Sequence, residues 1–372
     1  MKMKAAVLRQ FNKPASIEKI ELAPPKEREV LVKTRYTSFC HSDLHFMQGS
    51  FRDFRLPLVL GHEASGVVEE VGPGVTTLKK GDHVVPTWMI PCGECSECRS
   101  GRGFLCINSN RLHGTGGLLD GTSRLTDSKG NPCFHEIFVS GFAEYMVIPE
   151  KGAIKIREDL PLDQACFLGC CMPTGFGATY NAADIKPGDS VAIWGMGGVG
   201  LNVVRGVKSR GANPIIGVDL EGSKEAIARA FGVTHFINNS KEDPVPIIKK
   251  LTGMGAMFVF EAAGDIGAHV QAYWSLGPWG RLVQIGVSKP GAAIKADYPI
   301  TFTPLHCISL KGAIYGLIDT HRDIPIFADM AAKGELILDR LITKRFKVEE
   351  INDVAEAMDK RQIIGRWVCE WD

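Results

Sequence analysis

Four cysteines lie close together in the segment PCGECSECRSGRGFLC at 91–106. Cys92, Cys95, Cys98 and Cys106 have the spacing C-x2-C-x2-C-x7-C. Four thiolates complete a tetrahedral shell around Zn2+, and a complete shell leaves no position for a substrate. The spacing therefore predicts a structural zinc site. An iron–sulfur cluster is the competing interpretation, but ferredoxin motifs continue with a shorter gap and a proline.

A second group of metal-binding residue types is spread along the chain. It consists of Cys40, His62 and either Cys170 or Cys171. Two thiolates and one imidazole leave the fourth position of zinc open for water or substrate, as in catalytic zinc sites. Each residue alone is more often a small buried thiol or a satisfied histidine. The prediction of a catalytic zinc therefore depends on their combination with a dinucleotide-binding fold.

A glycine-rich turn follows a predicted strand in the stretch VAIWGMGGVG, and a helical pattern begins at once after it. Gly195, Gly197 and Gly200 would allow a tight turn and bring backbone N–H groups to a pyrophosphate at a helix N-terminus. The next predicted strand ends at Asp219, whose carboxylate would accept hydrogen bonds from the adenosine ribose. The next three residues contain no arginine to balance a 2′-phosphate. We therefore predict NAD rather than NADP.

The elements that position these groups are of two kinds. Over residues 1–174, short β-branched runs alternate with Gly and Pro turns, which is typical of an antiparallel, mostly β domain. Over residues 175–314, continuous apolar runs alternate with helical patterns, which predicts a doubly wound parallel sheet. The final segment, 315–372, contains a strand and an amphipathic helix that would return to the first domain. The sequence thus predicts an α/β protein with a mostly β catalytic domain and a Rossmann coenzyme domain.

Composition narrows the class of protein further. The chain has 372 residues, enough for two domains, and its 43 basic and 42 acidic residues nearly cancel. This balance leaves no excess of positive charge that would favour binding to nucleic acid or to an anionic membrane. The N-terminus lacks the features of a signal peptide, and no apolar window has transmembrane length. Eleven cysteines, odd in number and clustered, indicate metal binding in a reducing compartment. We therefore expect a cytoplasmic protein.

Taken together, these motifs resemble the zinc-containing medium-chain alcohol dehydrogenases over nearly the whole chain. The resemblance depends on C-H-S-D-L-H at 40–45, G-H-E at 61–63, the four cysteines, L-G-C at 168–170 with T-G at 174–175, G-M-G-G-V-G at 195–200 and K-G-A-I-Y-G at 311–316. The segment 112–136 resembles the longer, typically dimeric branch with the liver-type and glutathione-dependent formaldehyde enzymes. The resemblance implies a GroES-like catalytic domain, two zinc ions per chain, NAD and a homodimer.

The resemblance also assigns roles around the catalytic zinc. It implies that Cys40, His62 and Cys170 bind this metal, and that Glu63 ligates it transiently. Asp43 would orient the His62 ring from behind, as carboxylates commonly do for metal-bound histidines.

Further roles concern the proton, the coenzyme and the substrate. Ser42 would take the substrate proton, and His45 would receive it through the nicotinamide ribose. The implied coenzyme contacts are His41, Gly195, Gly197, Gly198, Val199, Gly200, Asp219, Lys224, Val287 and Arg366. His41 stands where many relatives have arginine, which predicts weaker NAD(H) binding and faster coenzyme release. The implied substrate pocket consists of Phe51, Trp88, Phe142 and Val287.

An apolar pocket of this kind predicts an enzyme that interconverts primary, hydrophobic or aromatic, alcohols and aldehydes by hydride transfer to NAD. The match to the liver-type channel is poor around Glu136 and Phe138, and a charged Glu136 in the channel would change the substrate class. A glutathione-dependent formaldehyde dehydrogenase is the alternative within the family, and a polyol dehydrogenase comes third. A zinc-binding redox-sensing or interaction module is the alternative from another class.

Overall fold

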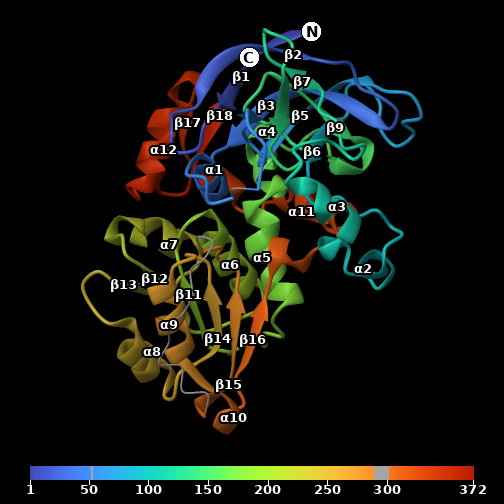
Figure 1. Cartoon of the computed structure of the whole chain (residues 1–372). Helices are drawn as coiled ribbons and strands as arrows, with labels where there is room; N and C mark the ends of the chain where they lie inside the picture. Colours follow the sequence, from blue (N-terminus) through green and yellow to red (C-terminus); the bar gives the residue numbers. More distant parts are fainter. Residues whose placement is uncertain (52, 289–300) are drawn as a thin grey trace. The chain divides into compact units, whose positions relative to one another are not determined.

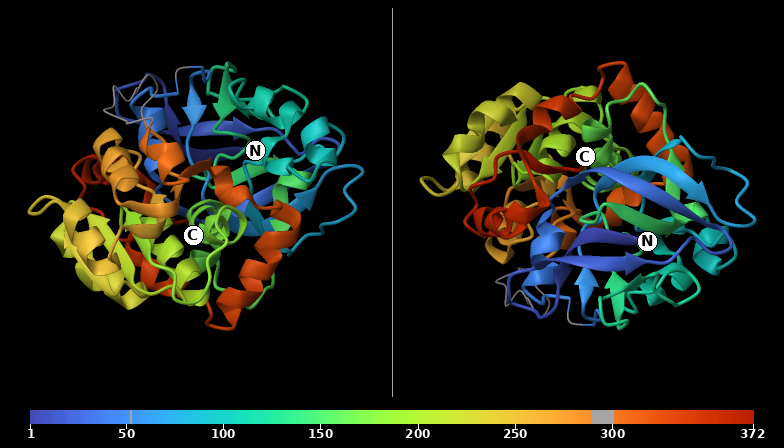
Figure 2. Two further views of the ribbon diagram at one scale, coloured as in Figure 1. Left: turned by 90° about the horizontal axis from the view of Figure 1, so that it is seen from below. Right: turned by 90° about the horizontal axis from the view of Figure 1, so that it is seen from above.

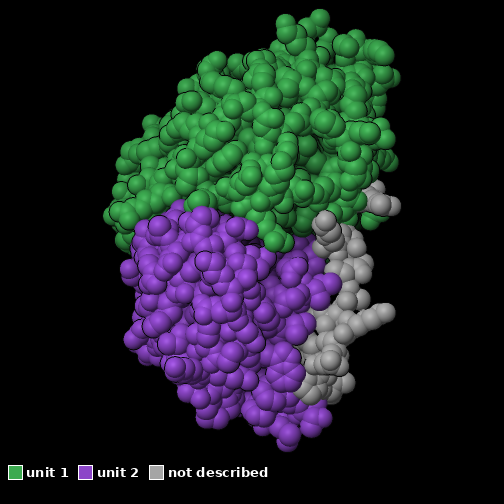
Figure 3. All heavy atoms as spheres, turned by 90° about the vertical axis from the view of Figure 1, so that its left-hand side faces the viewer, with its two compact units in different colours: residues 1–170, 319–372 green, residues 171–318 purple. Residues whose placement is uncertain are grey.

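The computed structural model describes residues 1–51, 53–288 and 301–372. It divides into two compact units, Met1–Cys170 with Asp319–Asp372 as unit 1 and Cys171–Ile318 as unit 2 (Figure 3). The sequence pattern placed the boundaries after 174 and 314. Helix α5 (Cys171–Asn181) accounts for the difference, because it packs closely on the 3-10 turn η5 (Ile314–Leu317). A Cβ atom on Gly316 would lie only 2.0 Å from the Pro173 carbonyl oxygen.

Unit 1 is built on two β-structures (Figure 1). A small closed barrel has the strand order β1 (Lys2–Leu8), β2 (Ser16–Leu22), β7 (Leu125–Thr126), β8 (Pro132–His135) and β4 (Leu58–Val59). A seven-stranded sheet has the order β10 (Ala153–Lys155), β6 (His83–Pro86), β5 (Ala64–Val71), β3 (Glu29–Ser38), β18 (Arg366–Glu370) and β17 (Ile342–Phe346), with β9 (Tyr145–Pro149) also paired to β3. Short strands with turns between them produce the mostly β unit that the sequence predicted.

The C-terminal segment completes unit 1. Strand β18 pairs antiparallel with β3, so residues near the two ends of the chain share one sheet. Helix α12 (Ile351–Asp359) contributes Ile351 and Val354 to a core that also contains Phe39 and Phe142. Figures 1 and 2 show this C-terminal segment in red beside the blue N-terminal strands. This core underlies helix α1 (His41–Met47), which carries the motif C-H-S-D-L-H.

Unit 2 contains a six-stranded sheet in which all the neighbouring strands are parallel. Its order is β13 (His235–Asn238), β12 (Ile215–Asp219), β11 (Val191–Trp194), β14 (Ala256–Glu261), β15 (Leu276–Gln284) and β16 (Ser309–Gly312). The chain runs outward from β11 to β13 and then returns to β14, so the order reverses between β11 and β14. This is the doubly wound arrangement that the sequence predicted, and such a reversal is where ligands of open α/β sheets bind.

Both units also contain helices. In unit 2 they are α6 (Gly198–Ser209), α7 (Glu225–Phe231), α8 (Pro244–Thr252), α9 (Ile266–Trp274) and α10 (Phe302–Leu305), together with α5. Unit 1 has α2 (Ser96–Arg99), α3 (Ile107–His113), α4 (Leu162–Ala165) and α11 (Thr320–Ala332) besides α1 and α12. Among the described residues, no helix has both the length and the apolar character needed to cross a bilayer.

Candidate active site

Three residues from distant parts of unit 1 bring their ligand atoms together. The donor atoms of Cys40, His62 and Cys170 all lie within 4.8 Å of one another, and the three residues are buried. Cys40 is the N-cap of α1, His62 precedes β5, and Cys170 follows the 3-10 turn η3 (Cys166–Gly169). Two sulfurs and one imidazole nitrogen are a donor set that Zn2+ accepts in catalytic sites. The cluster therefore fits zinc, and it is Cys170 rather than its neighbour Cys171 that joins it.

The electrostatics of the cluster favour a thiolate. The hydrogen bond from Cys170 lowers the pKa of the Cys40 thiol well below its usual value, and the His62 ring adds to this effect against the opposing effect of burial. A thiolate is the form in which cysteine binds metals. The Ser42 hydroxyl oxygen lies 3.8 Å from Cys40 Sγ, so the predicted proton acceptor stands beside the predicted ligand.

The rear of the His62 ring faces two carboxylates. Its Nδ1 atom lies 3.1 Å from Asp43 Oδ1 and 2.7 Å from Glu136 Oε1, and all three side chains have at most 1% of their surface exposed. Although burial opposes it, the charge of Asp43 raises the pKa of His62 well above its usual value. Because Nδ1 is engaged in this way, Nε2 is the ring atom that remains for a metal.

Glu136 is the residue at this site whose position the sequence left open. The resemblance left it near the substrate channel, whereas the structure buries it completely behind His62. Burial, together with the charge of Asp43, raises the pKa of Glu136 to about 8. One signal was present in the sequence: a glutamate inside the apolar run CFHEIFV needs a buried partner, because an unpaired buried charge is costly.

Glu63 and Arg366 lie together. Arg366 Nε is 3.5 Å from Glu63 Oε1, and both residues are buried. Among the described residues, Glu63 belongs neither to the cluster with Cys40 and Cys170 nor to the group with Asp43 and Glu136. The transient ligation by Glu63 and the coenzyme contact of Arg366 therefore stay predictions.

Helix α1 brings His41 and His45 together, as expected for positions i and i+4. Their ring centroids are 4.8 Å apart in an edge-to-face arrangement, with His41 exposed and His45 buried. Phe51, half-buried, contacts the His45 ring at a centroid distance of 5.9 Å. The predicted relay residue His45 therefore contacts both His41, a predicted coenzyme contact, and Phe51, a predicted pocket residue.

The other predicted pocket residues have different surroundings. Phe142 is fully buried and packs near Phe39 and Phe346, so its place in the substrate pocket stays a prediction. Trp88 is half-buried, and its carbonyl oxygen lies 2.8 Å from His113 Nε2. Val287, in unit 2, is exposed.

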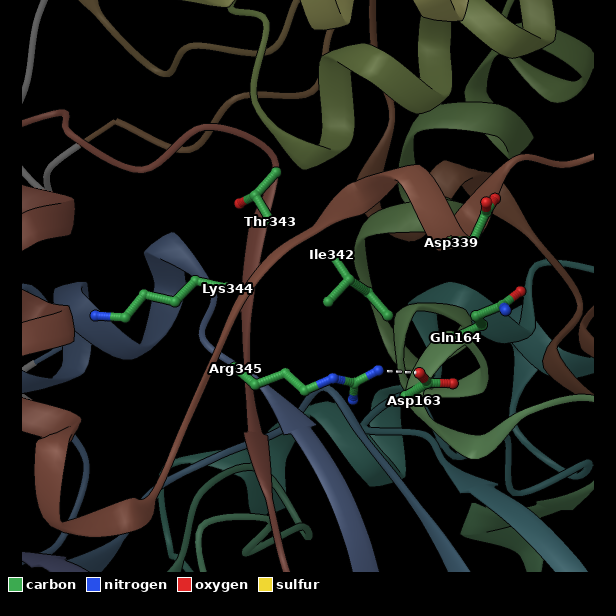
Figure 4. Close-up of a pocket in the computed structure, with 7 residues that line it drawn as sticks. All are labelled: Asp163, Gln164, Asp339, Ile342, Thr343, Lys344 and Arg345. Carbon is green, nitrogen blue, oxygen red and sulfur yellow. Dashed lines mark hydrogen bonds and ion pairs between the residues drawn. The ribbon is translucent and has the colours of Figure 1, made fainter.

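A separate surface cavity in unit 1 has a volume of about 370 Å3 (Figure 4). It is lined mainly by polar side chains, among them Asp163, Asp339, Lys344 and Arg345. Arg345 donates to Asp163 at 2.6 Å across it. None of the predicted site residues lines this cavity, so it has no part in the candidate active site.

The four cysteines at 92–106 form a separate cluster, with all four sulfurs within 4.8 Å of one another. Backbone N–H groups point at these sulfurs: Glu94 and Cys95 donate to Cys92 Sγ at 3.4 and 3.3 Å, Cys98 to Cys95 Sγ at 3.5 Å, and Cys92 and Ser109 to Cys106 Sγ at 3.3 and 3.5 Å. The bond from the Cys98 N–H lowers the pKa of Cys95 to about 6. Burial instead raises the pKa of Cys98 to about 12. The four sulfurs together fit a closed tetrahedral zinc shell.

In unit 2 the glycine-rich turn has the geometry that its sequence predicted. Gly195 has φ +90°, and a Cβ atom on Gly200 would lie 1.7 Å from the Gly195 carbonyl oxygen, so both positions require glycine. Asp219 ends β12 and accepts a hydrogen bond from the Met196 N–H at 2.7 Å. Lys224 Nζ lies 3.1 Å from both oxygens of Asp219. The two predicted ribose contacts are therefore adjacent to the turn and to each other.

Comparison with known proteins agrees with this geometry. Residues 26–158 match the model of the alcohol dehydrogenase GroES-like domain, and residues 198–333 match that of the zinc-binding dehydrogenase family. The chain is 40% identical to alcohol dehydrogenase 1 of Trifolium repens, covering 98% of this chain and 96% of the relative. It is 37% identical to an S-(hydroxymethyl)glutathione dehydrogenase of Escherichia coli, covering 98% of both chains. The crystal structure of benzyl alcohol dehydrogenase from Acinetobacter calcoaceticus superposes with a TM-score of 0.92 at 30% identity, covering all of both chains.

Proposed function

Because the chain belongs to the zinc-containing alcohol dehydrogenase family, we propose that it oxidises primary, hydrophobic or aromatic, alcohols to aldehydes with NAD, and runs the reverse reaction. The observation that supports this proposal most strongly is the buried cluster of Cys40, His62 and Cys170. A non-enzymatic zinc module does not fit a chain that matches named dehydrogenases over 98% of its length.

In this proposal each residue of the motif at 40–45 has a separate task. Cys40, His62 through Nε2, and Cys170 hold the catalytic zinc, which when bound supplies Lewis acidity that lowers the pKa of an alcohol hydroxyl. Ser42, next to Cys40, accepts the hydroxyl proton, and His45 passes it onward. Asp43 keeps the proton of the imidazole on Nδ1. Cys92, Cys95, Cys98 and Cys106 hold a second, structural zinc.

Coenzyme binding is assigned to the glycine-rich turn and to Asp219. Hydride acceptance is the chemistry that a nicotinamide coenzyme supplies when bound. Asp219 would accept hydrogen bonds from the ribose hydroxyls and repel a 2′-phosphate, whereas the adjacent Lys224 reduces that repulsion only in part. The remaining contacts proposed for the coenzyme are His41, Gly197, Gly198, Val199, Val287 and Arg366. A comparison of kcat/KM for NAD and NADP tests the assignment, and a preference for NADP would contradict it.

The substrate class is supported by the similarity to a benzyl alcohol dehydrogenase and by the apolar character of Phe51 and Trp88. The similarity to an S-(hydroxymethyl)glutathione dehydrogenase favours the second candidate, a glutathione-dependent formaldehyde dehydrogenase. A panel of aliphatic, aromatic and terpenoid alcohols with NAD, and formaldehyde with and without glutathione, separates the two. Turnover of formaldehyde only with glutathione, and none of benzyl alcohol, would replace the first candidate by the second. Trp88→Ala should raise activity on branched alcohols if Trp88 lines the pocket.

We also propose a homodimer, formed at the edge of the sheet in unit 2. Strand β16 is an edge strand whose four residues are all exposed, including Leu310 at 55%. Trp279 and Leu305 nearby are 72% and 74% exposed, and the Trp279 N–H bonds to the His306 carbonyl. Unpaired strand edges with apolar side chains are sites where a second chain pairs. Light scattering of the protein and of Leu310→Lys tests this, and a monomeric wild-type protein would contradict it.

A cytoplasmic location is the last part of the proposal. All eleven cysteines are free thiols, and six of them belong to the two clusters. Free thiols of this number suit a reducing compartment. Cell fractionation followed by immunodetection tests the location, and recovery from an oxidising compartment would contradict it.

A further inference from the structure

Two carboxylates, rather than one, face the single Nδ1 atom of His62. Glu136 Oε1 is the closer at 2.7 Å, and Asp43 Oδ1 lies at 3.1 Å. One N–H group points well at only one acceptor at a time, so the shorter contact is the stronger candidate for its hydrogen bond. The family resemblance assigned this task to Asp43 alone. Glu136 is therefore an additional partner that needs an explanation.

The second oxygen of each carboxylate holds a different part of the backbone. Asp43 Oδ2 accepts from the Cys40 N–H at 2.6 Å, and Glu136 Oε2 accepts from the Gly61 N–H at 2.9 Å. Asp43 therefore joins the ring to another ligand residue. Glu136 instead joins the ring to the peptide group directly before His62.

The segment that carries Glu136 also holds the other side of Gly61. The Gly141 N–H donates to the Gly61 carbonyl oxygen at 2.9 Å, so both backbone polar groups of Gly61 bond to residues 136–141. Gly61 has φ +102°, and a Cβ atom there would lie 2.6 Å from the Phe142 nitrogen. Such close approach leaves the backbone before His62 little freedom to move.

Strained backbone directly follows Glu136. Ile137 and Phe138 have φ +39° and +68°, and the Val139 N–H closes the turn on the Glu136 carbonyl at 2.9 Å. A positive φ is costly for a β-branched residue such as Ile137, and such strain persists where surrounding contacts enforce it, often at functional sites. Both side chains are buried, so the core supplies those contacts.

The three side chains do not suit a separate cation. Ligand atoms on a tetrahedron with bonds of about 2.0 Å are separated by about 3.3 Å. The observed separations of 2.7 and 3.1 Å from Nδ1 are those of hydrogen bonds instead.

We propose that Glu136 is a second positioning residue for His62, which fixes the Nδ1–H tautomer and the direction of Nε2 toward Cys40 and Cys170. This inference rests on the proposed role of His62 as a zinc ligand. Partners of this kind typically change metal affinity about 10- to 100-fold when they are replaced.

Glu136→Gln tests the proposal in the zinc-loaded enzyme. A glutamine has one acceptor oxygen, so it must lose the bond to His62 or the bond to Gly61. We expect the affinity of the catalytic site for zinc to fall about tenfold, with the structural zinc retained. The visible spectrum of the Co2+-substituted catalytic site should also change, because the direction of the imidazole changes. Zinc per chain is measured by elemental analysis after dialysis against graded chelator.

Glu150→Gln is the matched control. Glu150 is a buried carboxylate of unit 1 that accepts from the N–H groups of Thr76 and Thr77 at 2.7 and 2.8 Å. The same chemical change there should lower thermal stability and leave zinc affinity and the Co2+ spectrum unchanged. Should Glu136→Gln fold poorly, Glu136→Asp keeps the carboxyl group but withdraws it from Nδ1, and the same spectral change is expected.

The outcomes distinguish an error in the role of Glu136 from an error in the zinc ligand set. If Cys40→Ala loses one zinc and Glu136→Gln keeps wild-type zinc affinity and a wild-type Co2+ spectrum, the role of Glu136 is wrong and the ligand set stands. If Cys40→Ala retains two zinc ions, the ligand set itself is wrong. A Glu136→Gln protein that changes only in thermal stability, as Glu150→Gln does, would likewise overturn the proposal.

Discussion

The two cysteine-containing clusters of unit 1 are assembled in opposite ways. The four cysteines at 92–106 come from one short segment, and three of them are partly exposed. Cys40, His62 and Cys170 are far apart in the sequence, and all three are buried. The first cluster is therefore a local structure, whereas the second exists only when the strands and helices of unit 1 are in place.

The surroundings of the ligand atoms differ in the same way. Backbone N–H groups supply five of the hydrogen bonds to the sulfurs of the first cluster. Side-chain carboxylates of Asp43 and Glu136 orient the histidine of the second. Backbone donors persist whatever the side chain, but carboxylates are lost with a single substitution. Function should therefore be more sensitive to point changes around the second cluster.

Cys40→Ala should give the largest effect on activity. It removes one of three protein ligands, and the Lewis acidity lost with the metal is worth several kcal/mol of transition-state stabilisation. We expect kcat with NAD and benzyl alcohol to fall at least about 1000-fold, and zinc to fall from two ions per chain to one. Steady-state NADH formation and elemental analysis measure both. Activity within tenfold of wild type would remove Cys40 from the ligand set.

Cys98→Ala should affect stability more than chemistry. Loss of the zinc bound by the four cysteines should make the backbone of residues 92–113 less ordered, because structural zinc supplies folding free energy directly. We expect faster proteolysis confined to that segment, a Tm lower by several degrees, and a smaller loss of kcat than in Cys40→Ala. Ser96→Ala, at an exposed residue of the same segment outside the four cysteines, is the control. Equal losses of kcat in the two zinc variants would erase the functional distinction between the clusters.

His45→Ala should separate proton movement from metal binding. His45 lies in α1 but outside the donor cluster, so zinc should stay at two ions per chain. A proton-transfer group increases the rate about 100-fold or more when nothing can substitute for it. Because water can replace the last group of a relay, we expect kcat to fall only about tenfold. Added imidazole should restore part of the rate. Loss of zinc in His45→Ala would show that the residue supports the metal instead.

The same contrast decides what the sequence could predict. The four cysteines and the glycines at 195–200 each lie within one short segment. Their spacing in the sequence therefore predicted both sites, and the structure has the expected geometry. The parallel sheet was predictable from its continuous apolar strands. Glu136 was not, because its position behind His62 depends on the pairing of β4 with β8 and on a turn with positive φ at Ile137 and Phe138. Neither residue type signals such a turn, since glycine or asparagine is usual there.

Asn108→Ala should give the smallest effect and is the most direct test of the contrast. Asn108, which is not one of the four cysteines, donates from Nδ2 to Cys92 Sγ at 3.5 Å. One long hydrogen bond to sulfur of this kind contributes about 1 kcal/mol, so the zinc affinity of the first cluster should fall about fivefold. Chelator titration alongside Glu136→Gln makes the comparison. A larger loss in Asn108→Ala than in Glu136→Gln would mean that the first cluster depends on its side-chain donor. The backbone N–H groups would then be insufficient to hold the four sulfurs, and the distinction between the clusters would lie in burial alone.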